Sequence, residues 1–226
     1  MFPIKDTIRS RSFPLVTWAL ILINTLVFFF ETSLSAADLE QLIFNFGLVP
    51  ADFSFSNPLT WLPLLTHMFL HGSWYHLISN MWTFFIFGDN VEDRLGSGRF
   101  LLFYLVGGVA AGMIQMFQGG DPNIPSIGAS GAIAAVLGAY FLYFPRSKVV
   151  TFIPFLILIW FVNIPAVIYL GFWFVSQLFS GITSTSASGI AWWAHIGGFV
   201  FGLLMAMVVT AKRGVETWHR DEYYPW

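Results

Sequence analysis

Long apolar runs separated by short polar breaks extend along most of the chain. A helix needs roughly 20 apolar residues to cross the hydrocarbon core of a bilayer, which is about 30 Å thick. Six runs approach that length, and the breaks between them hold charged residues or glycine, proline and serine. The predicted spans are residues 14–30, 74–88, 100–117, 130–144, 165–180 and 192–211. The pattern therefore predicts an all-α membrane protein, a six-helix bundle in one domain over residues 1–226 with a short tail at 212–226.

The composition supports a membrane protein and excludes several kinds of site. The chain has 226 residues, of which 57% are hydrophobic and only 10% are charged, whereas soluble domains carry about 25% charged residues. Six spans with short loops leave no room for a separate soluble domain. Cysteine is absent, which excludes disulfides, a thiolate nucleophile and a cysteine-ligated metal.

The basic residues predict the orientation of the spans. All ten lie before the first span or after the second, fourth and sixth: Lys5, Arg9, Arg11, Arg94, Arg99, Arg146, Lys148, Lys212, Arg213 and Arg220. The positive-inside rule therefore places both termini in the cytoplasm. The other loops, near 31–73, 118–129 and 181–191, carry only acidic charges and are expected to face outward.

Three segments need separate comment. The basic start, the apolar run and SLSAAD could form a signal peptide, but residues 13–30 exceed the usual apolar core of about 7–15 residues, which favours a retained span. Residues 149–180 are too long for one span; we expect their first part at the cytoplasmic interface and a helix starting near Pro165. We expect the loop at 31–66 to lie partly in the outer interface.

Four polar side chains stand out among those inside the predicted spans, where polar groups are costly and usually mark function. They are Ser130, His195, His76 and Asn80. With a rise of about 1.5 Å per residue, Ser130, His195 and His76 lie about 22 to 26 Å above the inner boundary, and Asn80 lies one turn lower. Three helices thus bring polar groups to nearly the same depth, which predicts one site.

Small residues accompany two of these side chains along their helices. They are Ala134 and Gly138 beside Ser130, and Gly198 and Gly202 beside His195. Small residues at this spacing let helix backbones approach closely in lipid. Both helices run in the same direction, so packing of the two stripes should bring Ser130 against His195.

The expected group has the chemistry of acyl transfer. An imidazole can take the proton of a serine hydroxyl, whose oxygen then attacks a carbonyl carbon. His76 and Asn80 lie four residues apart on one helix face and can donate hydrogen bonds to the oxyanion. Backbone N–H groups at the start of the fourth helix can do the same. The glycines of GASG leave room for a substrate backbone.

Each of these residues also has a simpler explanation when taken alone. A serine in a small-residue stripe is usually a packing residue, and a single buried histidine or asparagine is often structural. The common depth, face and chemistry favour a site instead. His67 and His71 lie four residues apart and suggest a metal pair, but no HExxH motif or nearby carboxylate completes a ligand set. We expect no metal and no cofactor.

The chain resembles the rhomboid intramembrane serine proteases over roughly residues 15–211. Four stretches carry the resemblance in order: HGSWYHLISNM, GDNVEDRLG, GASGA and AHIGGFVFG. The resemblance implies that Ser130 is the nucleophile and His195 the general base, in a dyad without aspartate. It implies oxyanion roles for His76, Asn80 and the Ser130 backbone. The supporting positions are Gly128, Gly131, His71, Gly198 and Gly202.

The sequence departs from the family pattern in two places. Some members carry a tyrosine one turn after the nucleophile that packs on the catalytic histidine, whereas this chain has Ala134. Another residue must then orient His195, and Trp192, Trp193 and Tyr140 are the candidates. Well-known members also have a Trp-Arg pair in the first outer loop, whereas this loop has TWLPLLTH and no arginine.

We therefore predict a prokaryotic rhomboid-type serine endopeptidase in the plasma (inner) membrane. It should cleave a peptide bond in or just outside a transmembrane segment of another membrane protein, near the outward face. The expected partners are transmembrane substrates and the lipid bilayer, with no nucleic acid. A helical substrate must unwind, so we expect small or helix-weakening residues where it is cut. The fifth span, with GFWFVSQLF, is the candidate lateral gate beside the second.

Two other functions are compatible with a membrane bundle. A catalytically inactive relative would bind transmembrane helices without cutting them, although such proteins usually lose the nucleophile or the base. A small transporter or channel would carry ionisable residues through the membrane, whereas the acidic residues here lie in turns or tails.

Overall fold

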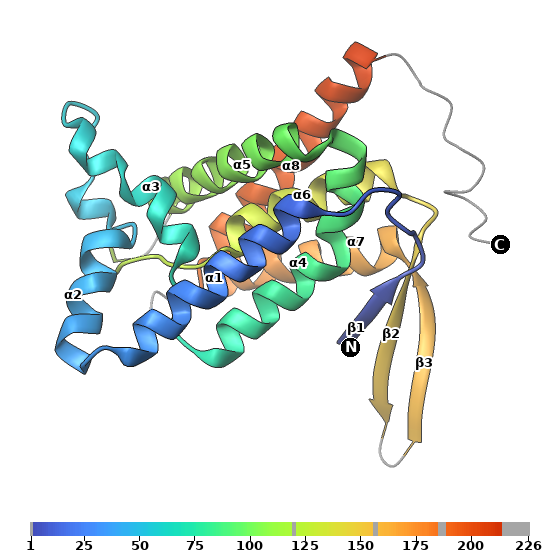
Figure 1. Ribbon diagram of the computed structural model, residues 1–226, viewed down its shortest axis with the longest axis horizontal. Helices are drawn as coiled ribbons and strands as arrows, with labels where there is room; N and C mark the ends of the chain where they lie inside the picture. Colours follow the sequence, from blue (N-terminus) through green and yellow to red (C-terminus); the bar gives the residue numbers. More distant parts are fainter. Residues whose placement is uncertain (1, 119–120, 156–157, 185–188, 214–226) are drawn as a thin grey trace.

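Six long helices form the body of the protein, with a small sheet at one end (Figure 1). The computed structural model describes residues 2–118, 121–155, 158–184 and 189–213. The long helices are α1 (Leu15–Ser33), α4 (Trp74–Leu95), α5 (Ser97–Gln118), α6 (Ser130–Tyr143), α7 (Ala166–Thr183) and α8 (Trp192–Arg213). Each coincides with one predicted span. Arg220 and most of the predicted tail lie outside the described residues.

Four of these helices are long and apolar enough to cross a membrane, which agrees with a multi-pass membrane protein. They are α1, α5, α7 and α8 as far as Thr210. Helix α4 continues past its predicted end through a polar segment to Leu95, and Gly96, with φ of 80°, follows it. Helix α6 has only 14 residues.

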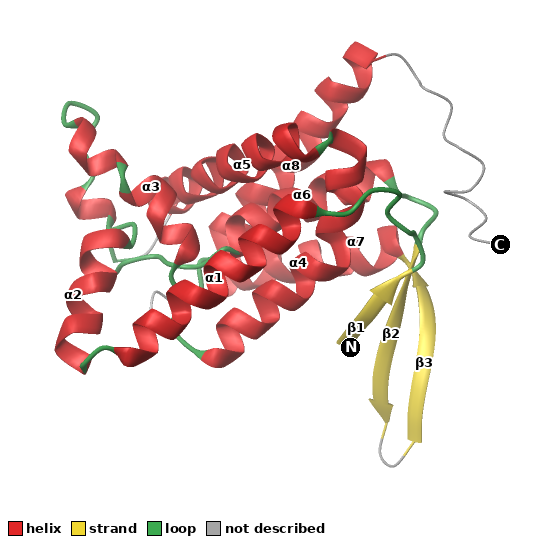
Figure 2. Ribbon diagram, viewed as in Figure 1, coloured by secondary structure: helices red, strands yellow, loops and turns green. Residues whose placement is uncertain are grey.

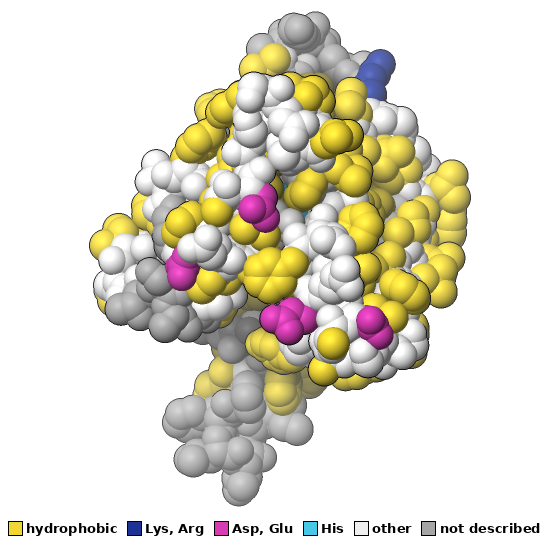
Figure 3. Space-filling model, turned by 90° about the vertical axis from the view of Figure 1, so that its left-hand side faces the viewer, with side chains coloured by type: hydrophobic (Ala, Val, Ile, Leu, Met, Phe, Trp, Pro, Cys, Tyr) yellow, Lys and Arg dark blue, Asp and Glu magenta, His cyan; other side chains and the backbone are white. Residues whose placement is uncertain are grey.

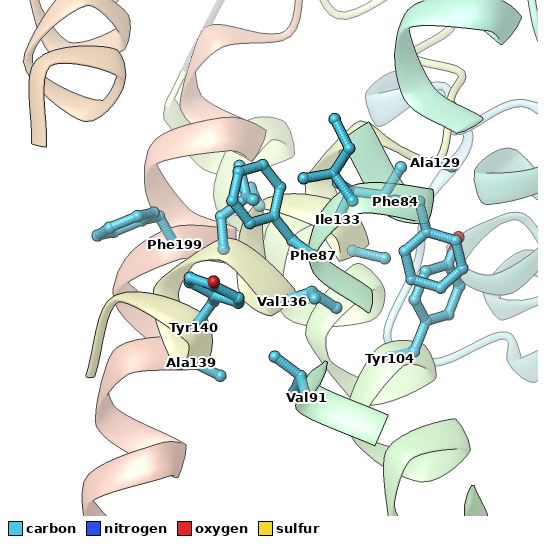
Figure 4. Packing of buried hydrophobic residues seen from close by; sticks show 14 of the residues in the cluster. Phe84, Phe87, Val91, Tyr104, Ala129, Ile133, Val136, Ala139, Tyr140 and Phe199 are labelled. Atoms are coloured by element: carbon cyan, nitrogen blue, oxygen red, sulfur yellow. The ribbon is translucent and has the colours of Figure 1, made fainter. Parts of the chain in front are cut away.

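The short helix α6 is the centre of the bundle. Eleven of its fourteen residues are buried, and it contacts α4, α5 and α8. A helix that is apolar on every side is expected to be buried on every side. Figure 4 shows Val136 and Tyr140 of α6 among side chains of the neighbouring helices, including Phe87 and Phe199.

Helices α6 and α8 approach each other through their small residues. A methyl group added at Gly198 would collide with the carbonyl oxygen of Gly131, and one added at Gly202 would collide with that of Ala135. The contacts advance by four residues on both helices, so the two run in the same direction. The predicted packing of the small-residue stripes is therefore observed.

The carboxylate of Glu92, near the end of α4, anchors the start of α1. It accepts hydrogen bonds from the backbone N–H groups of Val16 and Thr17, at 2.9 and 2.8 Å, and from the hydroxyl groups of Thr17 and Ser97. The first N–H groups of a helix have no acceptor within the helix, and this carboxylate supplies one. The turn motif GDNVEDRLG thus joins three helices.

The all-α prediction was wrong for residues 2–6 and 148–165. Three antiparallel strands, in the order β1-β2-β3, form a sheet beside the bundle (Figure 2). They are β1 (Phe2–Asp6), β2 (Lys148–Phe155) and β3 (Leu158–Pro165). Both hairpin strands are rich in β-branched and aromatic residues, which favour strands. The expected helix start is confirmed, because α7 begins at Ala166, directly after Pro165.

The segment between α1 and α4 is folded into short helices rather than an open loop. They are α2 (Ala36–Phe46), η1 (Pro50–Asp52), η2 (Pro58–Trp61), α3 (Pro63–Thr66) and η3 (His67–Phe69). Proline occupies the first position of η1, η2 and α3, where its missing N–H costs no helical hydrogen bond.

Charged groups are distributed unequally between the two ends of the bundle. The N-terminal strand, the α4–α5 turn and the connection from α6 to β2 lie at the same end (Figure 1). Within these segments or next to them in the chain lie Lys5, Arg9, Arg11, Arg94, Arg99, Arg146 and Lys148. Figure 3 looks onto the opposite end, where acidic side chains are scattered among hydrophobic ones. We call these two faces the basic end and the acidic end.

Candidate active site

Ser130 is the first residue of α6, at the point where the chain enters the bundle from the acidic end. The preceding segment is held by hydrogen bonds from Gly128 N–H to His67 O, at 2.8 Å, and between the backbones of Leu48 and Ser126. The first N–H groups of a helix lack partners within the helix. The serine hydroxyl therefore lies beside backbone donors that are free to bind a ligand.

His195, in the first turn of α8, lies against this serine. Its Nε2 atom is 2.8 Å from Ser130 Oγ. This separation is within the range that proton transfer between a hydroxyl and a base requires. The parallel packing of α6 and α8 brings the two side chains together from positions 65 residues apart.

The other ring nitrogen of His195 has a partner that the sequence analysis missed. Its Nδ1 atom is 2.8 Å from Oε1 of Gln177, a buried residue of α7. The only available signal was a lone glutamine in the apolar run GFWFVSQLF. That signal gave no indication of which helix face the glutamine occupied.

The three residues suggested for orienting His195 have different positions. The Trp192 ring lies edge-on to the His195 ring, with centroids 6.0 Å apart. Trp193 is near Gly181 of α7. Tyr140 was a wrong candidate, because its hydroxyl donates a hydrogen bond to Asp6 towards the basic end.

His76 and Asn80 of α4 face the backbone just before Ser130. A Cβ atom at Gly128 would come within 2.5 Å of His76 Nε2 and 3.8 Å of Asn80 Nδ2. Gly128 also has φ of 121°, which other residues rarely adopt. Among the described residues, the buried Nδ2 of Asn80 has no hydrogen-bond partner. It is a buried donor available to a ligand, since such groups are normally paired.

His71 lies behind His76, with its ring edge-on at a centroid distance of 5.0 Å. The backbone N–H of His71 donates to both carboxylate oxygens of Glu31, each at 3.2 Å. Glu31 is buried at the end of α1, and the sequence analysis did not single it out. His67 is held separately, with Nδ1 2.8 Å from Pro63 O.

The four polar residues line one cavity of about 740 Å³, together with the loops before α6 and α8. Gln115 of α5 also lines it, and its Oε1 accepts a hydrogen bond from Ala194 N–H at 3.1 Å. That bond holds the first turn of α8 against α5. The cavity is large enough for several side chains of a peptide, and small-molecule sites have similar volumes, of about 300 to 1,000 Å³.

Comparison with known proteins indicates one family. The family model described as Rhomboid domain matches residues 58–212. Three relatives are each named Rhomboid protease GlpG, from Salmonella newport (strain SL254), Salmonella typhimurium (strain LT2) and Salmonella choleraesuis (strain SC-B67). Each is 28% identical over 228 aligned residues, which cover 96% of this chain and 70% of the relative.

The match extends from the segment before α4 to the end of α8, and so includes every side chain that lines the cavity from α4, α5, α6 and α8. The fold, the cavity and the sequence comparisons thus concern the same part of the molecule. The chain belongs to the rhomboid family of intramembrane proteases.

Proposed function

We propose that the protein is a serine endopeptidase that cuts transmembrane segments of other membrane proteins, with Ser130 as nucleophile and His195 as general base. The observation that carries the proposal is the 2.8 Å separation of Ser130 Oγ and His195 Nε2 at a cavity of about 740 Å³. A serine activated by a neighbouring imidazole is the minimal apparatus of acyl transfer.

In the first step, Nε2 of His195 takes the hydroxyl proton while Oγ of Ser130 bonds to the carbonyl carbon of the scissile peptide. The carbonyl oxygen becomes an oxyanion. Donors for it are His76, Asn80 Nδ2 and the backbone N–H of Ser130, which all lie around Gly128. Electrostatic stabilisation of this kind is usually the largest contribution to catalysis.

The tetrahedral intermediate then collapses. The carbon–nitrogen bond breaks, and His195 gives its proton to the leaving amine. Water next attacks the acyl-enzyme, with His195 accepting one water proton and returning it to Ser130 Oγ as the ester bond breaks. The products are two peptide fragments, and the enzyme returns to its starting state.

We further propose six spans, with both termini in the cytoplasm of a prokaryotic cell and the cavity opening on the extracytoplasmic side of the plasma membrane. The basic end of the bundle supports this orientation through the positive-inside rule. Helices α4 and α6 are then the remaining two spans. The short α6 is shielded from lipid by its neighbours.

The test is covalent labelling of the detergent-purified protein with a fluorophosphonate, read by intact mass. One adduct is expected on the unaltered protein and none on Ser130→Ala or His195→Ala. Ser33→Ala is the matched control and should label normally, since this exposed serine donates only to the backbone oxygen of Phe30. If the unaltered protein took no adduct while another membrane serine hydrolase did, an inactive helix-binding relative would replace the proposal.

A further inference from the structure

We propose that Gln177 is a positioning residue of the reaction: its side-chain oxygen holds the imidazole of His195 in the tautomer and orientation that activate Ser130. The inference rests on the proposed function, because it assigns a role relative to that nucleophile and base. It also extends the site to a third helix, α7.

The hydrogen bonds of Gln177 determine which end of its amide faces the histidine. The side-chain nitrogen donates to Ser176 Oγ at 2.9 Å and to the carbonyl oxygen of Trp173 at 3.3 Å. Ser176 in turn donates its hydroxyl proton to the same Trp173 oxygen at 2.6 Å. With its N–H groups directed to these acceptors, the amide presents Oε1 to His195.

An amide oxygen can only accept, so Nδ1 of His195 must carry the proton of this bond. A neutral imidazole then has its lone pair on Nε2, which is the atom that faces Ser130 Oγ. The opposite tautomer would place an N–H towards the serine and could not take its proton. The contact with Gln177 therefore selects the one neutral form of His195 that acts as a base.

The burial of Gln177 indicates that this contact stabilises its position. Its side chain is 7% exposed, whereas Phe172, Val175 and Phe179 of the same helix are 60% exposed or more. An amide buried in a membrane helix is unfavourable unless it is hydrogen-bonded. All polar atoms of Gln177 have partners, on its own helix and on His195.

The other neighbours of His195 restrict the ring without selecting a tautomer. Trp173 lies tilted beside it and Trp192 edge-on, both at 6.0 Å between centroids. Ala134, which stands where the family pattern has a tyrosine, contributes only a methyl group and lies against Gly198. Gln177 thus provides the polar contact that orients the base.

Two substitutions by side chains of similar length distinguish the effect of the hydrogen bond from the effect of packing. Gln177→Met retains the volume but has no strong acceptor, whereas Gln177→Glu retains an oxygen that can accept from Nδ1. Val106→Ala, at an exposed position of α5, is the matched control. Labelling rate, kcat and KM for one transmembrane substrate, and thermal unfolding should be measured for all four proteins.

The expected result is a roughly 10- to 100-fold loss of kcat and labelling rate in Gln177→Met, with KM nearly unchanged, because misplacement of a catalytic group by about 1 Å can cost 100-fold. Gln177→Glu should recover most of the loss, and Val106→Ala should match the unaltered protein. Equal rates for Gln177→Met and the unaltered protein would overturn the inference, as would equal losses in the Met and Glu variants.

The unaltered protein provides a test that does not depend on variants folding. Nitrogen-15 NMR of the histidine side chains, with His195 assigned by His195→Ala, should show the proton on Nδ1. A proton on Nε2 instead would overturn the role of Gln177 while leaving fluorophosphonate labelling of Ser130 intact. A lack of labelling in the unaltered protein would overturn the proposed function and the positioning role together.

Discussion

Ser130 Oγ lies 2.8 Å from His195 Nε2, although the two residues are 65 positions apart and belong to different helices. Close backbone contact between α6 and α8 holds them together. The first helical residue of α6 and the first turn of α8 meet because Gly131 and Gly198 carry no side chain between the two backbones. The chemistry of the site therefore depends on the packing of a pair of helices.

Replacement of either residue by alanine should abolish proteolysis. Loss of a nucleophile or its base in a serine protease lowers kcat by roughly 10⁶-fold. Cleavage of a transmembrane substrate in detergent or liposomes measures this directly. The double variant should be no slower than either single variant, because the two residues act as a unit. Appreciable turnover by Ser130→Ala would assign the nucleophile to another residue.

Replacement of Asn80 by alanine should lower kcat by about 10² to 10³-fold, with a smaller effect on KM. Its Nδ2 has no partner among the described residues, and the lost hydrogen bond would form only as the oxyanion develops. Steady-state kinetics on one substrate give both constants. Asn163→Ala is the control, because this asparagine is exposed on β3. An unchanged kcat in Asn80→Ala would remove Asn80 from the oxyanion site.

Gly202→Ala should destabilise the bundle by about 1 to 3 kcal/mol, the usual cost of overpacking a core. The added methyl group would collide with the backbone of Ala135, which cannot move without displacing α6. Gly98→Ala is the matched control, since nothing lies within 4 Å of the position of its Cβ. Thermal unfolding in detergent should show a lower Tm for Gly202→Ala alone. Equal Tm values would mean that the two helices can separate without cost.

The attachment of the N-terminal strand should weaken as pH rises. Asp6 accepts hydrogen bonds from Tyr140, at 2.5 Å, and from Asn90, at 2.8 Å. Burial, aided by the neighbouring Asp89 and opposed by the Tyr140 hydrogen bond, raises the pKa of the Asp6 carboxyl to about 8. The folded state thus binds this proton more tightly than the unfolded state does.

The contribution of Asp6 to the free energy of unfolding is therefore complete below about pH 4 and is lost as pH rises through about 8. The slope should not exceed about 1.4 kcal/mol per pH unit, and partial exposure of Asp6 lowers it. Denaturation of the unaltered protein and Asp6→Asn from pH 5 to 9 measures the difference. A parallel pH dependence in both proteins would contradict the prediction.

The sequence alone predicted the helices well, for reasons that are local. A run of apolar residues must leave water, and a helix in lipid satisfies its own backbone hydrogen bonds, so the position of each long helix follows from hydropathy. The strands were missed because residues 149–165 were assigned to the membrane interface by charge and length. Strands β2 and β3 pair with each other locally, and β2 also pairs with β1, which lies more than a hundred residues earlier in the chain.

The gathering of four polar side chains around one cavity was predicted for a similar reason. Buried polar residues are rare in membrane helices, so Ser130, His195, His76 and Asn80 stand out in the sequence. Helical periodicity then indicates which of them share a depth. Gln177 was not identified, because its contact with His195 depends on which face of α7 packs against α8.

The sequence by itself determined the membrane class, the long helices, the charge asymmetry between the two ends and the polar residues that the helices carry. These properties follow from composition and short-range periodicity, which act within single segments. Only the tertiary structure decided that Glu92 caps α1, that β1 pairs with β2 at the basic end and that Gln177 contacts His195. Each of these is a contact between distant segments. Such contacts depend on the rotation and depth of whole helices relative to one another, which no single segment encodes.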